Sequence, residues 1–243
     1  MLLDTKDVVK RFGGLTAVNR VSMQVEEGEI YGLIGPNGAG KTTFLNSIAG
    51  RFPPTSGKVF FRGEETTGEP AEVMCKKGMA RTFQIPRPFP NLSVLNNVKV
   101  GAVFGPANGD PRPAQERARE ALEFVEFDQP IDTPAKRLNS VQLKRIDLAR
   151  AISCQPKLLL LDELASGLTP GELDSIMSLI LKIRDSGVTI IAIEHIMRVI
   201  KGICDEVMVI EYGSTIAEGT PDEVLDNPKV IEAYLGEEEV PSA

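Results

Sequence analysis

Short, continuous apolar runs recur along the chain, separated by polar stretches that hold glycine and proline. Such runs are typical of strands that are buried on both faces in a parallel sheet. Helical patterns lie between them, so strand and helix alternate, which predicts an α/β fold on a mainly parallel sheet. The predicted buried strands are Ile30–Ile34, Leu158–Leu161, Val188–Ile193 and Glu206–Ile210, and the predicted helices are Phe44–Ala49, Pro170–Asp185 and a stretch that ends near Cys204.

Weaker patterns predict further elements around this sheet. Leu2–Phe12 alternates only weakly between apolar and polar residues, and we predict an edge strand there. Thr220, Pro221 and Glu223 carry the start signature of a helix: a capping residue, proline at the first helical position and glutamate three residues after the cap. The other predictions are strands at Val21–Val25, Lys58–Phe61, Met79–Gln84 and Thr215–Ala217, a loop at Gly63–Gly68 and a hairpin turn at Glu211–Ser214.

The middle of the chain has a different character. Pro86, Pro88 and Pro90 follow one another too closely for regular structure, so they mark a break. Beyond them, apolar residues recur at helical spacing, which predicts a mostly helical insertion over residues 86–156. Its helices are expected at Leu92–Val103, Pro113–Phe127 and Val141–Ser153, and Gly105–Pro113 is expected to be a mobile loop.

Composition narrows the class of protein. The chain has 243 residues, of which 42% are hydrophobic and 25% charged, as in a soluble globular protein. Its net charge is −7 and no basic block occurs, so we expect no nucleic-acid partner. No apolar run approaches the ~20 residues that span a bilayer, and the first residues lack a signal-peptide pattern. We therefore expect a cytosolic protein without direct membrane insertion, whose membrane contacts come through a partner.

The cysteines do not suggest a cofactor site. Cys75, Cys154 and Cys204 are far apart in the sequence and match no spacing of a metal or redox motif. We expect three ordinary reduced thiols.

A glycine-rich stretch, Gly35–Thr43, follows the strand at Ile30–Ile34 and precedes a helix. It matches G-x-x-x-x-G-K-[ST] in the strand–loop–helix context that this pattern needs, and the alternative is a chance glycine-rich turn. Glycines let backbone N–H groups converge on an anion, and the helix N-terminus adds positive dipole character. We predict that the chain binds a nucleoside triphosphate through Asn37, Gly38, Ala39, Gly40, Lys41, Thr42 and Thr43. In this arrangement Lys41 reaches the β- and γ-phosphates, and the Thr42 hydroxyl binds Mg²⁺.

Two acidic residues end the strand at Leu158–Leu161, on the edge where α/β sheets place their sites. Asp162 is predicted to bind Mg²⁺, directly or through water. Glu163 is predicted to lie on the other side of an extended backbone and to act as the general base that polarises the attacking water. The alternative for this pair is a solvated strand end.

Three more residues are candidates for the same site. His195, the only histidine, is predicted to end its strand and contact the γ-phosphate, although a lone histidine is usually structural. Gln84 is predicted to bind Mg²⁺ or water through its amide, or else to be an ordinary polar strand terminus. Phe12 is an aromatic residue near the end of an early strand; it is predicted to stack on the base, or else to be a core or surface phenylalanine.

Taken together, these residues resemble the ATPase subunits of ABC transporters over essentially the whole chain. The residues that carry the resemblance are Phe12, Gly35–Thr43, Gln84, Leu158–Glu163 and His195, in their order and spacing. The chain is most similar to the subunits that serve branched-chain amino-acid importers, and lipid-export ATPases and urea-type importers share much of the pattern. The stretches that favour the first subgroup are Arg81–Gln84, Asn91–Val98, Ile193–Met197 and Val230–Gly236.

The resemblance implies a single nucleotide-binding domain over residues 1–243, with a RecA-like P-loop NTPase core. Residues 1–85 and 157–243 would form the ATP-binding α/β core with an antiparallel β subdomain, and residues 86–156 a helical subdomain. It further implies two copies arranged head to tail with ATP and Mg²⁺ between them. The segment after Gln84, with Arg87 and Phe89, is implied to touch the coupling helix of a transmembrane permease subunit, on the cytoplasmic face of the membrane.

The segment that aligns with the family's signature motif departs from the usual Leu-Ser-Gly-Gly-Gln. It reads Leu138, Asn139, Ser140, Val141, Gln142, and the resemblance implies that these residues contact ATP held by the partner copy. Val141 puts a β-branched side chain where a bare backbone normally approaches the γ-phosphate. Two lesser departures follow Asp162: Leu164 stands where proline is usual, and Thr169 where aspartate is common.

These departures lead us to expect a heterodimer with unequal sites, because a homodimer would have two impaired ones. Two functions follow: an ATPase coupled to solute import, or an ATP-dependent dimerisation clamp with weak hydrolysis. Within the first, branched-chain amino acids are the expected solute, and urea or amides, or lipid export, are the alternatives. A soluble ABC protein that acts on nucleic acid is disfavoured by the acidic charge.

Overall fold

A six-stranded sheet forms the centre of the part of the chain that the computed structural model describes, residues 1–105 and 112–238. Its strand order is β10-β9-β3-β8-β7-β6, and every pair is parallel except β10 with β9. The predicted buried strands are confirmed. The bounds are β3 (Ile30–Ile34), β6 (Met79–Arg81), β7 (Leu158–Asp162), β8 (Thr189–Ile193), β9 (Glu206–Glu211) and β10 (Ser214–Gly219).

The core explains why these strands read as continuous apolar runs. Along β3, Ile30 and Ile34 belong to a cluster with the helices on one side of the sheet. Tyr31 and Leu33, between them, belong to a second cluster on the opposite side. Successive side chains of a strand point to opposite faces, so a strand that is covered on both faces needs an apolar residue at nearly every position.

A smaller antiparallel sheet packs against the second cluster, with the order β2-β1-β4-β5. The predicted edge strand is wrong, because β1 pairs with β2 on one side and with β4 on the other. Irregular register between Thr5 and Val8, where Asp7 has φ 48°, breaks the alternation and explains the weak pattern. The strands are β1 (Leu3–Phe12), β2 (Leu15–Val25), β4 (Ser56–Phe61) and the short β5 (Glu64–Glu65), which lies in the predicted Gly63–Gly68 loop.

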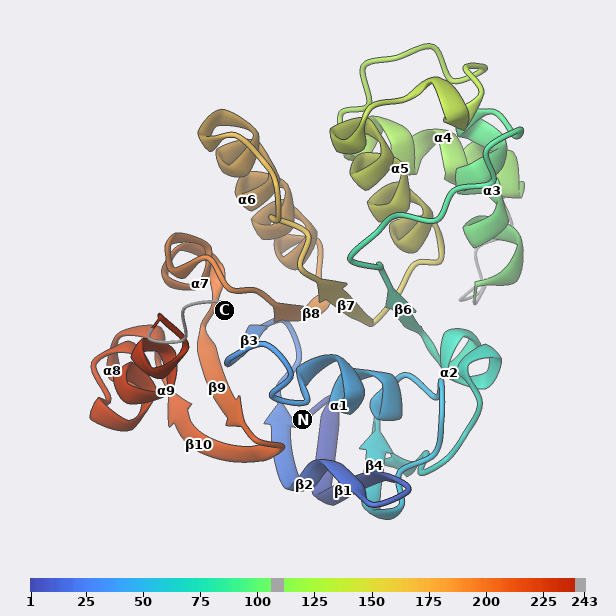
Figure 1. The fold of residues 1–243 in the computed structure, drawn as a ribbon. Coiled ribbons are helices and arrows are strands. Elements are labelled where there is room, and N and C mark those ends of the chain that lie inside the picture. The colour runs from blue at the N-terminus through green and yellow to red at the C-terminus, as the bar shows by residue number, and fades with distance from the viewer. Residues whose placement is uncertain (106–111, 239–243) are drawn as a thin grey trace.

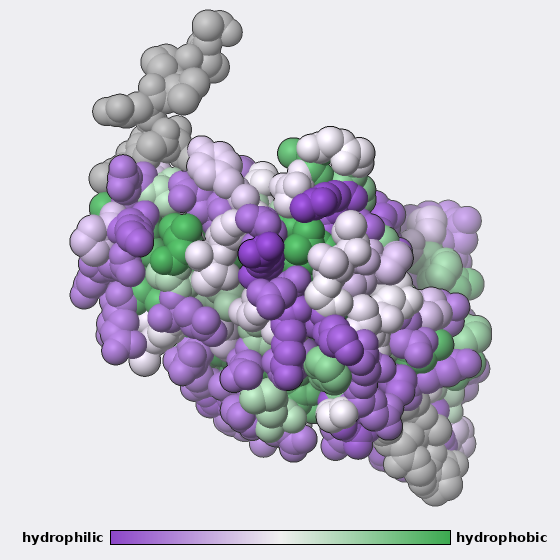
Figure 2. Space-filling view, turned by 90° about the horizontal axis from the view of Figure 1, so that it is seen from below, coloured by the Kyte–Doolittle hydropathy of each residue, from purple (hydrophilic) through white to green (hydrophobic). Residues whose placement is uncertain are grey.

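The view from below, on the side where β1, β2 and β4 lie in Figure 1, shows a mostly hydrophilic surface with hydrophobic residues in separate patches (Figure 2). An antiparallel sheet with one face on a core and one face in water has this distribution.

Helices cover both sides of the central sheet (Figure 1). Helices α3, α4 and α5 pack on one another in an arm (Figure 1). Arg145 of α5 and Phe124 of α4 are hydrogen-bonded to α6, so the arm contacts that helix. This arm lies within the predicted helical insertion, and the division at residues 86 and 156 stays a prediction. The helices are α1 (Lys41–Ile48), α2 (Ala71–Lys77), α3 (Val94–Phe104), α4 (Ala114–Phe124), the 3₁₀ turn Ala135–Arg137, α5 (Ser140–Ser153), α6 (Pro170–Asp185), α7 (Met197–Ile203), α8 (Pro221–Leu225) and α9 (Pro228–Glu238).

Local signals account for several of these helices. Helix α6 has the bounds that were predicted, and α8 starts with the predicted capping box between Thr220 and Glu223. Helices α2 and α9 were not anticipated. Most of the predicted mobile loop, residues 106–111, lies outside the described residues. Among the described residues, no helix has both the length and the apolar character needed to cross a bilayer.

Candidate functional site

The glycine-rich stretch forms a tight loop between β3 and α1, as predicted. At Gly35, an added Cβ would lie 2.0 Å from the Ile210 carbonyl oxygen; at Gly40, 2.3 Å from that of Ala17. Both glycines have positive φ, 142° and 106°, so this path is closed to larger residues. Gly40 also caps α1 without a side-chain hydrogen bond, which leaves the helix N-terminus open to an anion.

Lys41 places its charge inside this loop. Its side chain is buried, and Nζ donates to the carbonyl oxygens of Gly35 at 2.5 Å and Pro36 at 2.7 Å. Around it, Asn37, Gly38 and Thr42 are exposed, Gly40 and Thr43 are half-buried and Ala39 is buried. The loop therefore places a buried cation beside exposed backbone and the exposed residue Thr42, whose hydroxyl is a further polar group, and this combination suits a polyphosphate.

Asp162 ends β7 in a buried ion pair that the sequence did not reveal. Arg81, the last residue of the neighbouring β6, donates through Nη2 to Asp162 Oδ2 at 2.6 Å. Arg81 also donates to the side chain of Asn46 on α1. The predicted metal ligand is thus tied to the helix that begins at the glycine loop, and Oδ1 is the carboxylate oxygen not bonded to Arg81.

Gln84 and Glu163 meet at the same edge of the sheet. Gln84 Nε2 donates to Glu163 Oε2 at 2.6 Å. Two predictions about their backbone are wrong, however. Strand β6 ends at Arg81 rather than at Gln84, because the chain turns away at Phe83, whose N–H donates to Asp147 Oδ2 of α5 at 3.1 Å. Glu163 is not extended: its φ is 49°, and its N–H donates to the Ile193 carbonyl at 2.9 Å.

His195 follows β8 instead of ending it, so that prediction is wrong by two residues. Strand β8 ends at Ile193, which lies opposite Asp162 in the register of β7 and β8. The His195 side chain is exposed, whereas Glu194 beside it is 1% exposed. The loop after β8 therefore brings one exposed imidazole and one buried carboxyl to the sheet edge that carries Asp162.

The loop that follows Glu163 is held from two sides by buried charged residues. From α5, Lys144 Nζ donates to the Leu164 carbonyl at 2.7 Å and to that of Ser166. From the β8 side, Glu194 Oε1 accepts from the Ala165 N–H at 2.9 Å. Burial lowers the pKa of Lys144 and raises that of Glu194 to about 7. Neither residue was a predicted site residue, because Lys144 stands in no recognised motif and Glu194, although it lies in the stretch Ile193–Met197, was given no role.

We expect Glu194→Gln to stabilise the protein at pH 8 by about 1–3 kcal/mol. The carboxyl is nearly inaccessible, Oε2 has no hydrogen-bond partner, and the nearby charges are Glu163 and Lys144. Because the pKa of Glu194 is raised from 4.5 to about 7 on folding, the wild-type free energy of unfolding falls as pH rises between these values. The amide keeps the bond to Ala165 and carries no charge.

Urea unfolding at pH 5 and pH 8 measures this effect, with Glu27→Gln, at an exposed turn, as the control. An equal gain at both pH values, or none at pH 8, would contradict the assignment of Glu194 as the titrating group.

The signature segment forms the start of α5, in the helical arm and away from α1 in Figure 1. Asn139 Oδ1 accepts from the Gln142 N–H at 2.9 Å, and Gln142 Oε1 accepts from the Asn139 N–H at 3.1 Å. Asn139 is therefore engaged as a helix cap. Ser140 is exposed and Val141 half-buried in the first turn. The structure does not bring Asn139–Gln142 together with the glycine loop of the same chain.

Phe12 ends β1 with 47% of its surface exposed, so it is not a core residue. Its ring meets that of Phe52 edge-on at a centroid distance of 5.4 Å, and Lys10 Nζ lies 5.1 Å from the Phe12 centroid. An exposed, propped aromatic ring is suited to stacking on a base. That role stays a prediction.

The oxygen donors at this edge suit a magnesium ion that accompanies a triphosphate. Hydroxyl and carboxylate oxygens are the ligands that Mg²⁺ prefers, and Thr42 and Asp162 supply one of each. The Gln84 amide is engaged with Glu163 through its nitrogen, which leaves its oxygen as a third donor.

Comparisons with known proteins agree with this geometry. Residues 18–166 match the family described as ABC transporter, and residues 214–240 match the family described as branched-chain amino acid ATP-binding cassette transporter. The branched-chain amino acid transport ATP-binding protein BraF of Pseudomonas aeruginosa is 40% identical over 250 residues, which cover 97% of this chain and 98% of that protein. The probable LivG protein of Archaeoglobus fulgidus is 37% identical, with coverage of 97% and 95%.

The structure is also similar to solved structures of ATP-binding cassettes from ABC transporters. The ADP conformation of MJ1267, an ATP-binding cassette of an ABC transporter, superimposes with a TM-score of 0.88 at 31% identity, covering 97% of this chain and 98% of that one. The predicted fold class, a P-loop NTPase core with an antiparallel β subdomain and an inserted helical subdomain, is confirmed.

Proposed function

This chain belongs to the ABC transporter family, and we propose from that premise that it is the ATP-hydrolysing subunit of an importer for branched-chain amino acids. One observation carries the hydrolytic part: Glu163, bonded to Gln84, follows Asp162 at the carboxyl end of β7. The glycine loop follows β3 at the same edge of the sheet, with β8 between the two strands. The solute is supported by the match of residues 214–240 to a family described for branched-chain amino acids, and by the names of the relatives.

The chain's own residues divide the work as follows. The N–H groups of the loop and the Lys41 ammonium hold the β- and γ-phosphates. Thr42, Asp162 and Gln84 would hold Mg²⁺, which would neutralise part of the negative charge on the phosphates. Glu163 accepts a proton from the attacking water, Gln84 orients Glu163, and His195 contacts the γ-phosphate. Phe12 stacks on the base, so the site accepts purines.

A second copy or a related subunit completes the site. Asn139, Ser140, Val141 and Gln142 contact ATP held by the partner, and the separation of this segment from the chain's own glycine loop supports that arrangement. We propose a heterodimer in which the impaired ATP site is the one that Val141 of this chain contacts, where the partner holds the ATP. The exposed Arg87 and Phe89 touch a permease subunit, which holds the chain at the cytoplasmic face of the membrane. We expect no nucleic-acid partner.

Val141→Gly is expected to raise ATP turnover of the purified homodimer by about tenfold, or ~1.4 kcal/mol of barrier. The change removes the β-branched side chain from the first turn of α5 and leaves the capping bonds of Asn139 and Gln142 in place. Val141→Ala should give a smaller gain, and circular dichroism checks the helix. Unchanged turnover in a folded variant would refute the steric account. Robust hydrolysis by the wild-type homodimer would refute the heterodimer proposal.

The clamp remains a second candidate because of Val141, and transport itself tests between the two. We would reconstitute the chain with its permease and partner ATPase subunits in proteoliposomes and measure ATP-driven uptake of labelled leucine, isoleucine and valine. Uptake that stops with Glu163→Gln supports the proposal. Uptake of urea or amides instead would reassign the solute, and uptake equal with wild-type and Glu163→Gln chains would favour the clamp.

A further inference from the structure

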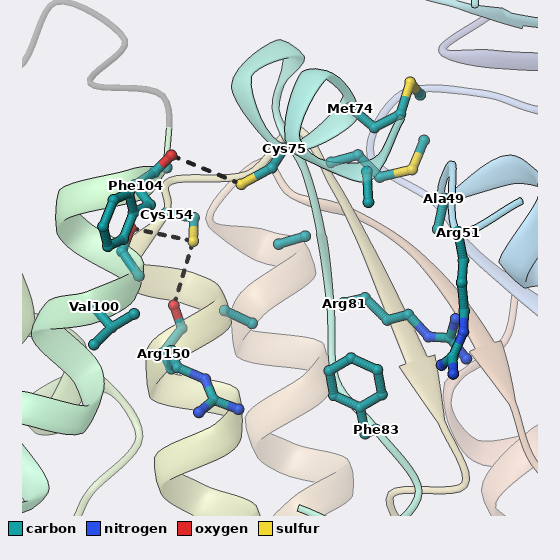
Figure 3. A pocket seen from close by; sticks show the side chains of 16 residues that line it. Ala49, Arg51, Met74, Cys75, Arg81, Phe83, Val100, Phe104, Arg150 and Cys154 are labelled. Carbon is teal, nitrogen blue, oxygen red and sulfur yellow. Dashed lines mark hydrogen bonds between the residues drawn. The ribbon is translucent and has the colours of Figure 1, made fainter. Parts of the chain in front are cut away.

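We propose that Cys75 and Cys154 form a two-thiol site that reacts with small-molecule disulfides and closes into a disulfide between α2 and α5. The sequence predicts three ordinary reduced thiols, and all three cysteines are free in the structure. The structure brings two of them to one cavity of about 450 Å³, lined also by Met74, Met79 and Phe104. Figure 3 shows the two cysteines reaching from different elements toward the same end of α3.

Both sulfur atoms contact a single turn of α3. Cys75 Sγ lies 4.0 Å from the Phe104 carbonyl oxygen, and Cys154 Sγ lies 3.4 Å from that of Gly101 (Figure 3). Cys154 is also fixed by its own helix, since Sγ lies 3.5 Å from the Arg150 carbonyl oxygen. A Cβ added at Gly105 would lie 2.7 Å from Cys154 Cβ, so the backbone packs closely around this thiol. Both thiols therefore lie against the same turn of α3.

The two thiols are also differentiated for a stepwise reaction. Interaction with Cys154 lowers the pKa of Cys75 to about 7, with help from the positive charge of Lys76. The same interaction, together with burial, raises the pKa of Cys154. Cys75 is half-buried and Cys154 8% exposed, so Cys75 is the thiol that a small reagent meets first. Cys75 is thus the attacking thiolate and Cys154 the resolving thiol.

The reaction balances with one oxidised disulfide as the co-reactant. The Cys75 thiolate attacks a sulfur of the small disulfide, its S–S bond breaks, and one thiolate leaves with the electron pair. Cys154 then loses its proton to solvent or to the departing thiolate and attacks Cys75 Sγ, and the second small thiolate leaves. The product is a Cys75–Cys154 disulfide and two reduced small thiols.

Closure would join the two walls of the cavity. Helix α2 precedes β6, whereas Cys154 follows the last residue of α5. Asp147 of α5 accepts a hydrogen bond from the N–H of Phe83, the residue immediately before Gln84. The same helix starts with the signature segment. A covalent tie at its far end therefore restrains movement of α5 relative to the sheet. The expected loss of turnover rests on the proposed function, whereas formation of the disulfide does not.

The test treats the reduced full chain with glutathione disulfide at pH 7 and follows it by intact mass and peptide mapping. We expect one intramolecular link, between the peptides of Cys75 and Cys154. At pH 7 the thiolate fraction of Cys75, with a pKa of about 7, is about 16-fold that of an ordinary thiol. The lower nucleophilicity of its thiolate offsets part of this advantage, so we expect modification about threefold faster. Cys204, buried with a pKa raised to about 12, is the internal control and should not react. Two independent mixed disulfides, or no link, would overturn the proposal.

Single variants separate the two roles. Cys154→Ser should stop at a stable mixed disulfide on Cys75, and Cys75→Ser should leave Cys154 unmodified; the reverse pattern would refute the assigned roles. Thermal melts show whether each variant folds, and a Cys→Ala variant replaces any Cys→Ser variant that does not fold. In the assembled transporter, oxidation should lower ATP turnover at least about fivefold, reversibly with dithiothreitol, and not in Cys75→Ser. A complete link with unchanged turnover would overturn the restraint on α5. If the reduced protein already showed no ATP turnover, this result would contradict the proposed ATPase function and would leave the proposed disulfide unaffected.

Discussion

Lys41→Met is expected to lower ATP turnover by at least about 100-fold and to weaken ATP binding strongly. Lys41 Nζ is the buried cation of the glycine loop, held by the carbonyl oxygens of Gly35 and Pro36. In the proposed complex it exchanges these contacts for charge-assisted bonds to the β- and γ-phosphates. Methionine keeps most of the side-chain length but removes the positive charge and every hydrogen-bond donor. The negative charge of the β- and γ-phosphates would then have no ammonium group to pair with.

Calorimetric titration with Mg-ATP and a steady-state phosphate assay measure this prediction. The matched control is Lys58→Met, at an exposed lysine of β4 that pairs with Glu65. Wild-type affinity and turnover in a folded Lys41→Met protein would show that the loop does not bind the phosphates.

Glu163→Gln is expected to reduce turnover by about 100- to 1,000-fold while leaving ATP affinity within about twofold. Glutamine has the same shape, and its amide oxygen still accepts the bond that Gln84 Nε2 donates to Oε2. What the change removes is the ability to take a proton from the attacking water. ATP should therefore persist between the two subunits, and the dimer should become more stable.

The same phosphate assay, together with size-exclusion chromatography in the presence of Mg-ATP, gives both readouts. Glu27→Gln, at an exposed turn before β3 and so at the opposite end of that strand from the glycine loop, is the control. Turnover that equals that of the wild type would remove Glu163 from catalysis and favour the clamp.

Local patterns explain what the sequence could predict. The glycine loop, the bounds of α6 and the capping box of α8 depend on residues within a few positions of one another, so their chemistry is visible in the sequence. The parallel strands are equally visible, because burial on both faces makes them continuously apolar.

Contacts between distant residues explain what was missed. The Arg81–Asp162 ion pair joins residues 81 positions apart, and Lys144 reaches the Ser166 carbonyl from 22 positions away. Each depends on how strands and helices are placed by the whole fold. The left-handed backbone of Glu163 is likewise imposed by its place between β7 and the loop held by Lys144 and Glu194. For the same reason, the meeting of Cys75 and Cys154 could not be read from their spacing.

The proposed function requires one site at which the glycine loop and the ends of β7 and β8 act on the same ligand. A crystal structure of Glu163→Gln grown with ATP and Mg²⁺ tests it most directly. We predict a triphosphate cradled by the loop N–H groups and Lys41 Nζ, with Mg²⁺ bound by Thr42 and Asp162 and His195 facing the γ-phosphate. A nucleotide bound elsewhere, or phosphates beyond reach of both Lys41 and Asp162, would contradict it.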